Sequence, residues 1–313
     1  MSRREIFIGC LCAFGSEAIF GIGYVSAKAA MSRAEPLALL GWRFALAAAA
    51  MGALAATGVI RVRLRGKPLR RLAAVAFLIV LYYALETVGI ARTTACESSA
   101  ILASIPVAAI AASALLLHRK PTRRQTLGIL VTLGGVIAST FAGGVTATFS
   151  PSGYAFLIAC APTYALYFVA VDAASRDFSG VEITLAMLVA LAATFAPLAV
   201  LSAARSGGAD AVLALLRLPF ADRGFLLPLV WLAFCSAVVG FFLANVAIAK
   251  AGVNRAASFI GVATLVAVVA GTAILGETFT ALQTAAAILI LTGVWIANSL
   301  VEPPTTGDQG SAT

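Results

Sequence analysis

Residues 118–128 read HRKPTRRQTLG, and residues 276–286 read GETFTALQTAA. The Thr-x-x-Gln-Thr pattern that starts at Thr122 in the first stretch returns at Thr280 in the second. The first stretch carries two Lys/Arg pairs, whereas the second has no Lys or Arg and has Glu277 in the place of Arg119. Two copies that share turn residues and differ in charge are predicted to face different surroundings.

The composition around these stretches is that of a membrane protein. The chain has 313 residues, of which 61% are hydrophobic and only 11% are charged, and its mean hydropathy is +1.01. Soluble domains are about half apolar and about a quarter charged. The sequence therefore predicts a polytopic membrane protein in which the lipid bilayer is the main partner.

The formal net charge of +9 does not indicate nucleic-acid binding. A nucleic-acid binder gathers its Lys and Arg on one water-facing surface, but here these residues lie in short loops between apolar runs. Such charges orient a chain in a bilayer. We expect no nucleic-acid partner.

The residues that metal or covalent chemistry needs are scarce. The cysteines lack the paired spacing of a metal or redox site, and His118 is the only histidine. A zinc site or a Ser-His or Cys-His dyad has almost nothing to be built from. We expect no cofactor, no metal and no enzymatic activity.

The apolar runs predict an all-α integral membrane protein with ten transmembrane helices. A helix needs roughly 20 apolar residues to cross the hydrocarbon, and these runs lack strand alternation. The ten runs lie near residues 6–26, 36–58, 71–91, 96–117, 126–143, 153–173, 182–203, 226–248, 255–275 and 279–300.

The first run also resembles a signal peptide, because Arg3 and Arg4 precede it and VSAKA follows near its end. Its length exceeds the usual apolar core of a signal peptide, which favours an uncleaved span. The longest loop, from Arg205, contains an apolar stretch that fits the membrane interface. The polar tail, residues 302–313, is predicted to be disordered and cytoplasmic.

An internal duplication explains the two copies of the turn. Residues 83–136 align with 241–294 at a constant shift, with Leu85 on Leu243 and Gly135 on Gly293. Each half then has five spans, residues 1–145 and 146–301, and an odd number inverts the second half. Lys and Arg collect on the cytoplasmic side, so the turn around Glu277 is expected outside.

The loop charges of the first half set the orientation. Arg3 and Arg4, the linker RVRLRGKPLRR and the turn HRKPTRR alternate with segments of few cations. We therefore expect both termini on the cytoplasmic side of the inner (plasma) membrane. Inverted repeats are a device of transporters that work by alternating access.

The sequences of the two copies resemble those of a known family. QTLGILVTLGGVIAS from Gln125, and ASFIGVATLVAVVAGTAILGETFTALQTAAAILILTGVWIA from Ala257, are similar to the paired EamA-type repeats of the drug/metabolite transporter superfamily. The first copy keeps a proline, Pro106, and lacks the turn glutamate; the second keeps Glu277 and lacks the proline. The resemblance implies a ten-helix exporter, like the bacterial exporters of amino acids, including aromatic ones.

The charged residues that lie well inside predicted spans, rather than at their ends, are Glu17, Arg43 and Glu86. Ionisable groups in hydrocarbon are unfavourable by at least about 2.5 kcal/mol each and usually face a cavity or a partner. All three fall in the outer half of the bilayer. One hypothesis is a structural ion pair between Arg43 and either carboxylate; the other leaves a carboxylate free for a substrate ammonium group or a proton.

A set of aromatic residues lies deeper than the interfacial belts where Trp and Tyr are common. These candidate substrate-binding residues are Trp42, Tyr82, Tyr83, Tyr164 and Tyr167. Each alone is explained by packing, but the set favours a cavity with aromatic walls. Pro106 and Pro162 are expected to kink their helices and open space near the midplane.

The function predicted from these patterns is export of amino acids, aromatic ones among them, or related small metabolites by a monomer or homodimer. The alternative is an exporter of other hydrophobic or cationic compounds. An intramembrane enzyme and a non-transporting scaffold are more distant alternatives.

Overall fold

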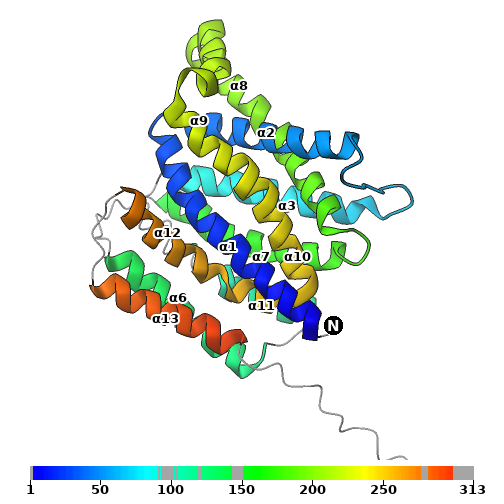
Figure 1. The fold of residues 1–313 in the computed structure, drawn as a ribbon, viewed down its shortest axis with the longest axis vertical. Coiled ribbons are helices and arrows are strands. Elements are labelled where there is room, and N and C mark those ends of the chain that lie inside the picture. The colour runs from blue at the N-terminus through cyan, green and yellow to red at the C-terminus, as the bar shows by residue number, and fades with distance from the viewer. Residues whose placement is uncertain are drawn as a thin grey trace, which may run out of the picture.

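The computed structural model describes residues 3–90, 92, 102, 105–118, 121–142, 151–275 and 281–298. The regular elements of these residues are helices, which Figure 1 shows packed into one bundle. They are α1 (Arg3–Met31), α2 (Pro36–Ala56), α3 (Leu69–Ile90), α5 (Ile105–Leu116), α6 (Arg123–Ala142), α7 (Pro151–Ala174), α8 (Gly180–Ala221), α9 (Arg223–Val230), the π-helix η1 (Trp231–Gly240), α10 (Phe241–Ala251), α11 (Val253–Ser258), α12 (Ile260–Leu275) and α13 (Ala281–Asn298).

Within the described residues, six helical segments are long and apolar enough to cross a membrane. They are Arg3–Met31, Pro36–Ala56, Leu69–Gly89, Pro151–Ala174, Gly180–Ala221 and Arg223–Ala251. Shorter apolar helices cover Ile105–Leu116, Val253–Ala267 and Thr284–Ala297. The prediction of an all-α membrane protein is confirmed, while the count of ten spans stays a prediction.

The turn residues of the opening stretch cap a helix. The Thr122 backbone N–H donates to Oε1 of Gln125 at 3.0 Å, and the Gln125 N–H donates to Oγ1 of Thr122 at 3.2 Å. This reciprocal pair satisfies two donors that the first turn of α6 leaves open. The corresponding residues of the second copy up to Thr280 lie outside the described part, as does the tail from residue 299.

The helices α6 and α13 cross at glycines that the repeat alignment relates. A Cβ added at Gly128 would lie 2.5 Å from the carbonyl oxygen of Gly293, and one at Gly135 would lie 3.0 Å from that of Ala286. The shift that aligns residue 83 with 241 exchanges these two contacts. Because rising numbers on α6 meet falling numbers on α13, the equivalent helices run antiparallel (Figure 1).

The same exchange relates other contacts between the halves. Tyr83 and Phe241, which occupy equivalent positions, have ring centroids 6.2 Å apart. At the level of helices, α3 packs on α7 as α10 packs on α1. These contacts are therefore related by an exchange of equivalent positions.

Pro106 lies in α5 and α7 stays helical through Pro162, so the expected kinks at these prolines stay predictions. The expectation for the longest loop is changed by the structure. The loop after Arg205 is helical: α8 breaks at Gly207 and Gly208, whose φ is 63°, and continues to Ala221.

Candidate functional site

The centre of the bundle holds a polar cluster that begins with Arg43 of α2. Its Nη2 donates to Oγ of Ser236 at 3.0 Å, and its guanidinium lies 5.1 Å from the Phe44 ring centre and 5.7 Å from that of Tyr83. Arg43 is only 9% exposed, and its Nε has no hydrogen-bond partner among the described residues. A buried cation is thus held by a hydroxyl and two aromatic faces.

The π-helix η1 presents Ser236 to Arg43. A π-helix places residues at a different angle from an α-helix, and such segments occur often at functional sites. η1 packs on both α1 and α2, and Ser236 is buried there. The residues of α3 at the equivalent repeat positions form an ordinary α-helix, so the two halves differ in winding at this site.

The two carboxylates of the cluster differ in their partners. Glu86 accepts a hydrogen bond from the Tyr82 hydroxyl at 2.6 Å, one helical turn away on α3. Glu17 of α1 is 8% exposed, and no hydrogen bond or ion pair of Glu17 is found in the described part of the chain. The hydroxyl of Tyr24 interacts electrostatically with both carboxylates and with Arg43.

The expected ion pair is therefore not formed in this conformation. Across the ranges that the structure describes, no ion pair joins Arg43 to Glu17 or Glu86, whereas a hydrogen bond joins it to Ser236. Arg43 interacts with Glu86 at longer range. The cation and the carboxylates share one region of the bundle without direct contact.

Tyrosines form the wall beside these charges. Tyr82 lies 4.6 Å from Tyr164 and 5.4 Å from Tyr83 between ring centroids, and Tyr164 lies 5.2 Å from Tyr167. Four of the five predicted aromatic residues are thus brought together by α3 and α7. Tyr24, which the sequence analysis did not identify, is 55% exposed. It interacts electrostatically with the charged residues of the cluster.

Tyr167 belongs to the core rather than to an open surface. It is 1% exposed, and its hydroxyl donates to Oδ1 of Asn245 at 2.9 Å. Asn245 in turn donates from Nδ2 to Oγ1 of Thr184 at 2.9 Å. This buried chain connects α7, α10 and α8, so Tyr167 is not available to a substrate in this structure.

Trp42 lies apart from the tyrosines. Its Nε1 donates to the carbonyl oxygen of Leu215 at 2.9 Å, and its ring packs on Phe220 at 6.5 Å between centroids. The neighbouring residue Arg43 points elsewhere because successive residues on a helix are about 100° apart. Trp42 therefore fastens the last part of α8 to the bundle.

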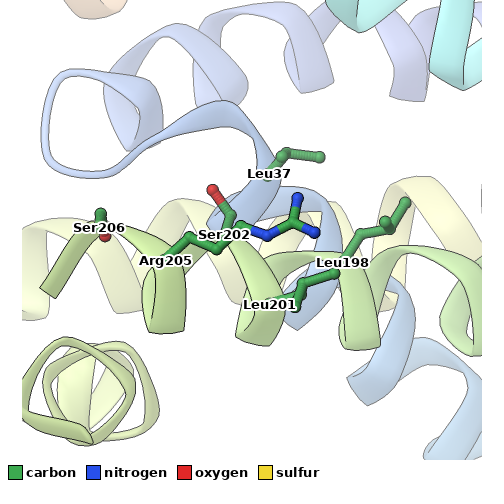
Figure 2. A pocket seen from close by; sticks show the side chains of 6 residues that line it. All are labelled: Leu37, Leu198, Leu201, Ser202, Arg205 and Ser206. Atoms are coloured by element: carbon green, nitrogen blue, oxygen red, sulfur yellow. The ribbon is translucent and has the colours of Figure 1, made fainter. Parts of the chain in front are cut away.

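A surface pocket between α2 and α8 is also separate from the cluster. Figure 2 shows its lining, in which Arg205 is the only charged residue. The lining residues are Leu37, Leu198, Leu201, Ser202, Arg205 and Ser206. None of the predicted site residues contributes to it.

The cluster brings together charged groups, hydroxyl groups and aromatic faces that a small molecule could contact. Many transporters are built from two repeats with a substrate site where the repeats meet. The chain belongs to the EamA-like transporter family, whose model matches residues 7–141 and 151–299. Membership in the drug/metabolite transporter superfamily, which the repeats predicted, is confirmed.

One relative and one solved structure are similar to the chain along most of its length. The chain is 28% identical over 289 residues to an uncharacterized transporter, YcxC, of Bacillus subtilis (strain 168), covering 92% of this chain and 91% of that protein. A crystal structure with 16% sequence identity superposes with a TM-score of 0.74 over 92% of this chain and 97% of its own. That structure supports the fold alone.

Proposed function

We propose that this transporter exports amino acids, including aromatic ones, from the cytoplasm by alternating access. The observation that carries the proposal is Arg43, a buried guanidinium with no carboxylate partner in the described part of the chain. A lone charge within the bilayer is unfavourable by at least about 2.5 kcal/mol. A substrate carboxylate would provide the missing anion.

Glu17 and Glu86 suit the ammonium end of the same substrate. Glu86 already accepts a hydrogen bond from Tyr82, whereas Glu17 is buried and makes no hydrogen bond or ion pair with the described residues. Glu17 is therefore assigned to meet the ammonium group or to exchange a proton, and Glu86 to support it. A zwitterion bound in this way would give both Arg43 and Glu17 a partner of opposite charge, while Glu86 keeps its hydrogen bond from Tyr82.

The side chain of the substrate would meet the tyrosines. Tyr82, Tyr83 and Tyr164 present ring faces and hydroxyls next to the charges. Tyr24 interacts electrostatically with the same charges. Rings of this kind hold flat amphipathic solutes by stacking and hydrogen bonding. Tyr167 and Trp42 are left out of the site, because each is bonded to another part of the bundle.

The proposed architecture has ten spans in two inverted halves, residues 1–145 and 146–301. The antiparallel crossing of α6 and α13 at repeat-related glycines supports the inversion. The loop cations support cytoplasmic termini in the inner membrane. Alternating access then corresponds to an exchange of conformations between the halves.

Counterflow into proteoliposomes tests the proposal. Vesicles preloaded with unlabelled substrate should accumulate labelled Phe, Trp, Thr or Met, and the response to a pH gradient reports proton coupling. Arg43→Met should weaken binding by about 1.5 to 3 kcal/mol, the worth of a hydrogen bond to a charged group, while Arg205→Met serves as a matched control. Absence of saturable amino-acid counterflow would reject the substrate class.

An exporter of hydrophobic cations is the second candidate. Glu17 and the aromatic walls favour it, because cations bind over aromatic faces next to a carboxylate. In that case a quaternary ammonium compound would show counterflow, no amino acid would, and Arg43→Met would not weaken transport.

A further inference from the structure

The two halves are joined by ion pairs at both ends of the bundle. At one end, Arg71 near the start of α3 pairs with Asp177 in the turn after α7. At the other end, Asp222 at the start of α9 pairs with Arg33 in the turn after α1, at 3.4 Å. These ends are separated by the length of α2, about 30 Å for its 21 residues (Figure 1).

The two pairs are counterparts in the repeat. Each joins the turn after the first helix of one half to the start of the third helix of the other half. The shift that places Glu35, the N-cap of α2, over Ser179, the N-cap of α8, also places Arg33 over Asp177. The charges are reversed between the two ends, so each pair stays attractive while its sequence differs.

The Arg71 end is held far more firmly. Glu182, which is 4% exposed, accepts from Lys67 Nζ at 2.8 and 2.9 Å and from the backbone N–H of Arg63 at 2.8 Å. Lys67 Nζ also lies 5.1 Å from the centre of the Phe178 ring. The residue that precedes Glu182 in the capping box, Ser179, donates its N–H to the same carboxylate at 2.8 Å.

The Arg33 end has a single exposed pair. The side chains of Arg33 and Asp222 are 55% and 30% exposed, and a surface pair of this kind contributes about 0 to 1 kcal/mol. A buried carboxylate with several charged and backbone donors is much harder to separate from its partners. The structure is therefore closed at the Arg71 end and weakly fastened at the Arg33 end.

We infer that these clusters are a pair of reciprocal latches: separating Lys67 and Arg71 from Glu182 and Asp177 opens one end of the bundle as the other end closes. The inference rests on the alternating access proposed above. It adds that loss of the Arg71 latch alone, without substrate, opens the Arg71 end and closes the Arg33 end. Because Glu182 keeps its backbone donors when Lys67 is removed, latch variants are expected to fold.

Distances between spin labels test the latches without any substrate, so the result does not depend on the substrate class. The full chain, with its five cysteines replaced by alanine, carries one label pair at Arg65→Cys and Ser175→Cys and, in a second version, at Ser32→Cys and Ala221→Cys. In lipid nanodiscs, Lys67→Met with Arg71→Met should lengthen the first distance by about 5 Å, one helical turn, and shorten the second. The matched control, Arg61→Met with Arg70→Met, removes two cations of the same linker whose side chains form no ion pair or hydrogen bond with the described residues.

Charge exchange provides the second arm. Arg71→Asp with Asp177→Arg and an intact Lys67 should return both distances to those of the parent protein. An unchanged first distance in the latch variant, or a first distance that lengthens while the second does not shorten, would overturn the inference. If the wild-type protein shows no amino-acid counterflow but the latch variant still changes both distances reciprocally, the proposed substrate is wrong and the latch inference stands.

Discussion

Tyr82 and Tyr83 are adjacent on α3, but their side chains meet different groups. Tyr82 bonds Glu86 and stacks on Tyr164, whereas Tyr83 packs against Phe44 and faces Arg43. The two side chains therefore serve different ends of the proposed substrate. Tyr82 lies beside the aromatic wall and Tyr83 beside the guanidinium.

Truncating Tyr82 or Tyr164 should lower substrate affinity, whereas altering Tyr167 should lower stability. Tyr164→Ala and Tyr82→Ala are each expected to lower the affinity for phenylalanine by about 1 to 3 kcal/mol, because each removes a stacking or hydroxyl contact. This corresponds to roughly five- to 150-fold in the counterflow half-saturation concentration.

Tyr167→Phe is the comparison for these variants. It removes the hydrogen bond to Asn245 and should lower stability by about 1 kcal/mol with no change in affinity. Thermal unfolding in detergent measures the first quantity and counterflow the second. Undiminished counterflow in both Tyr82→Ala and Tyr164→Ala would place the site elsewhere.

The sequence predicted the members of the cluster better than their pairings. Ionisable residues in apolar runs, such as Glu17 and Arg43, stand out because burial in lipid is unfavourable. Ser236 and Tyr24 were missed, since a single serine or tyrosine in an apolar helix has no distinguishing pattern. The spacing of Tyr82 and Glu86, four residues apart, is the one local signal that could have revealed their hydrogen bond.

At the scale of elements, the crossing of α6 and α13 depends on side-chain size. A Cβ added at Gly135 would lie 2.8 Å from Cγ1 of Ile290 and 3.0 Å from the carbonyl oxygen of Ala286. A Cβ added at the adjacent Gly134 would lie 3.9 Å from its nearest neighbour, Cδ2 of Leu289. Small residues at such crossings let helix backbones approach within a membrane.

Gly135→Ala and Gly134→Ala are therefore a matched pair of variants. Both gain up to about 1 kcal/mol of helix propensity, but Gly135→Ala overpacks the crossing, which typically destabilises by about 1 to 3 kcal/mol. We expect a lower unfolding temperature for Gly135→Ala and an equal or higher one for Gly134→Ala. Equal unfolding temperatures would mean that the two helices do not approach closely here.

Elements stabilised by local patterns were predictable, and those that depend on tertiary contacts were not. The start of α6 follows from Thr122 and Gln125, whose capping pattern is visible in the sequence. Trp42 was expected in the cavity, but the part of α8 after Gly208 folds back to meet it. Nothing in the sequence of η1 distinguishes a π-helix from an α-helix.

For the whole molecule, the inverted repeat makes a prediction about topology. Reporter tags at Gly66 and Asp308 should both read cytoplasmic, and a tag at Ala147 should read external, given the distribution of loop cations. Asp308 carries the most information because it follows the last predicted span. An external signal there would require an odd number of spans and would remove the inversion.

The central claim, that one site recognises a carboxylate and an ammonium group together, is tested most directly by competition. Counterflow of labelled phenylalanine is measured against phenylalanine, against 3-phenylpropionate, which lacks the ammonium group, and against phenethylamine, which lacks the carboxylate. In the wild type both analogues should compete at least about tenfold less well than phenylalanine, since each leaves a buried charge unpaired. In Arg43→Met, phenethylamine should compete as well as phenylalanine. If phenethylamine already competes equally in the wild type, Arg43 does not bind the carboxylate and the claim is wrong.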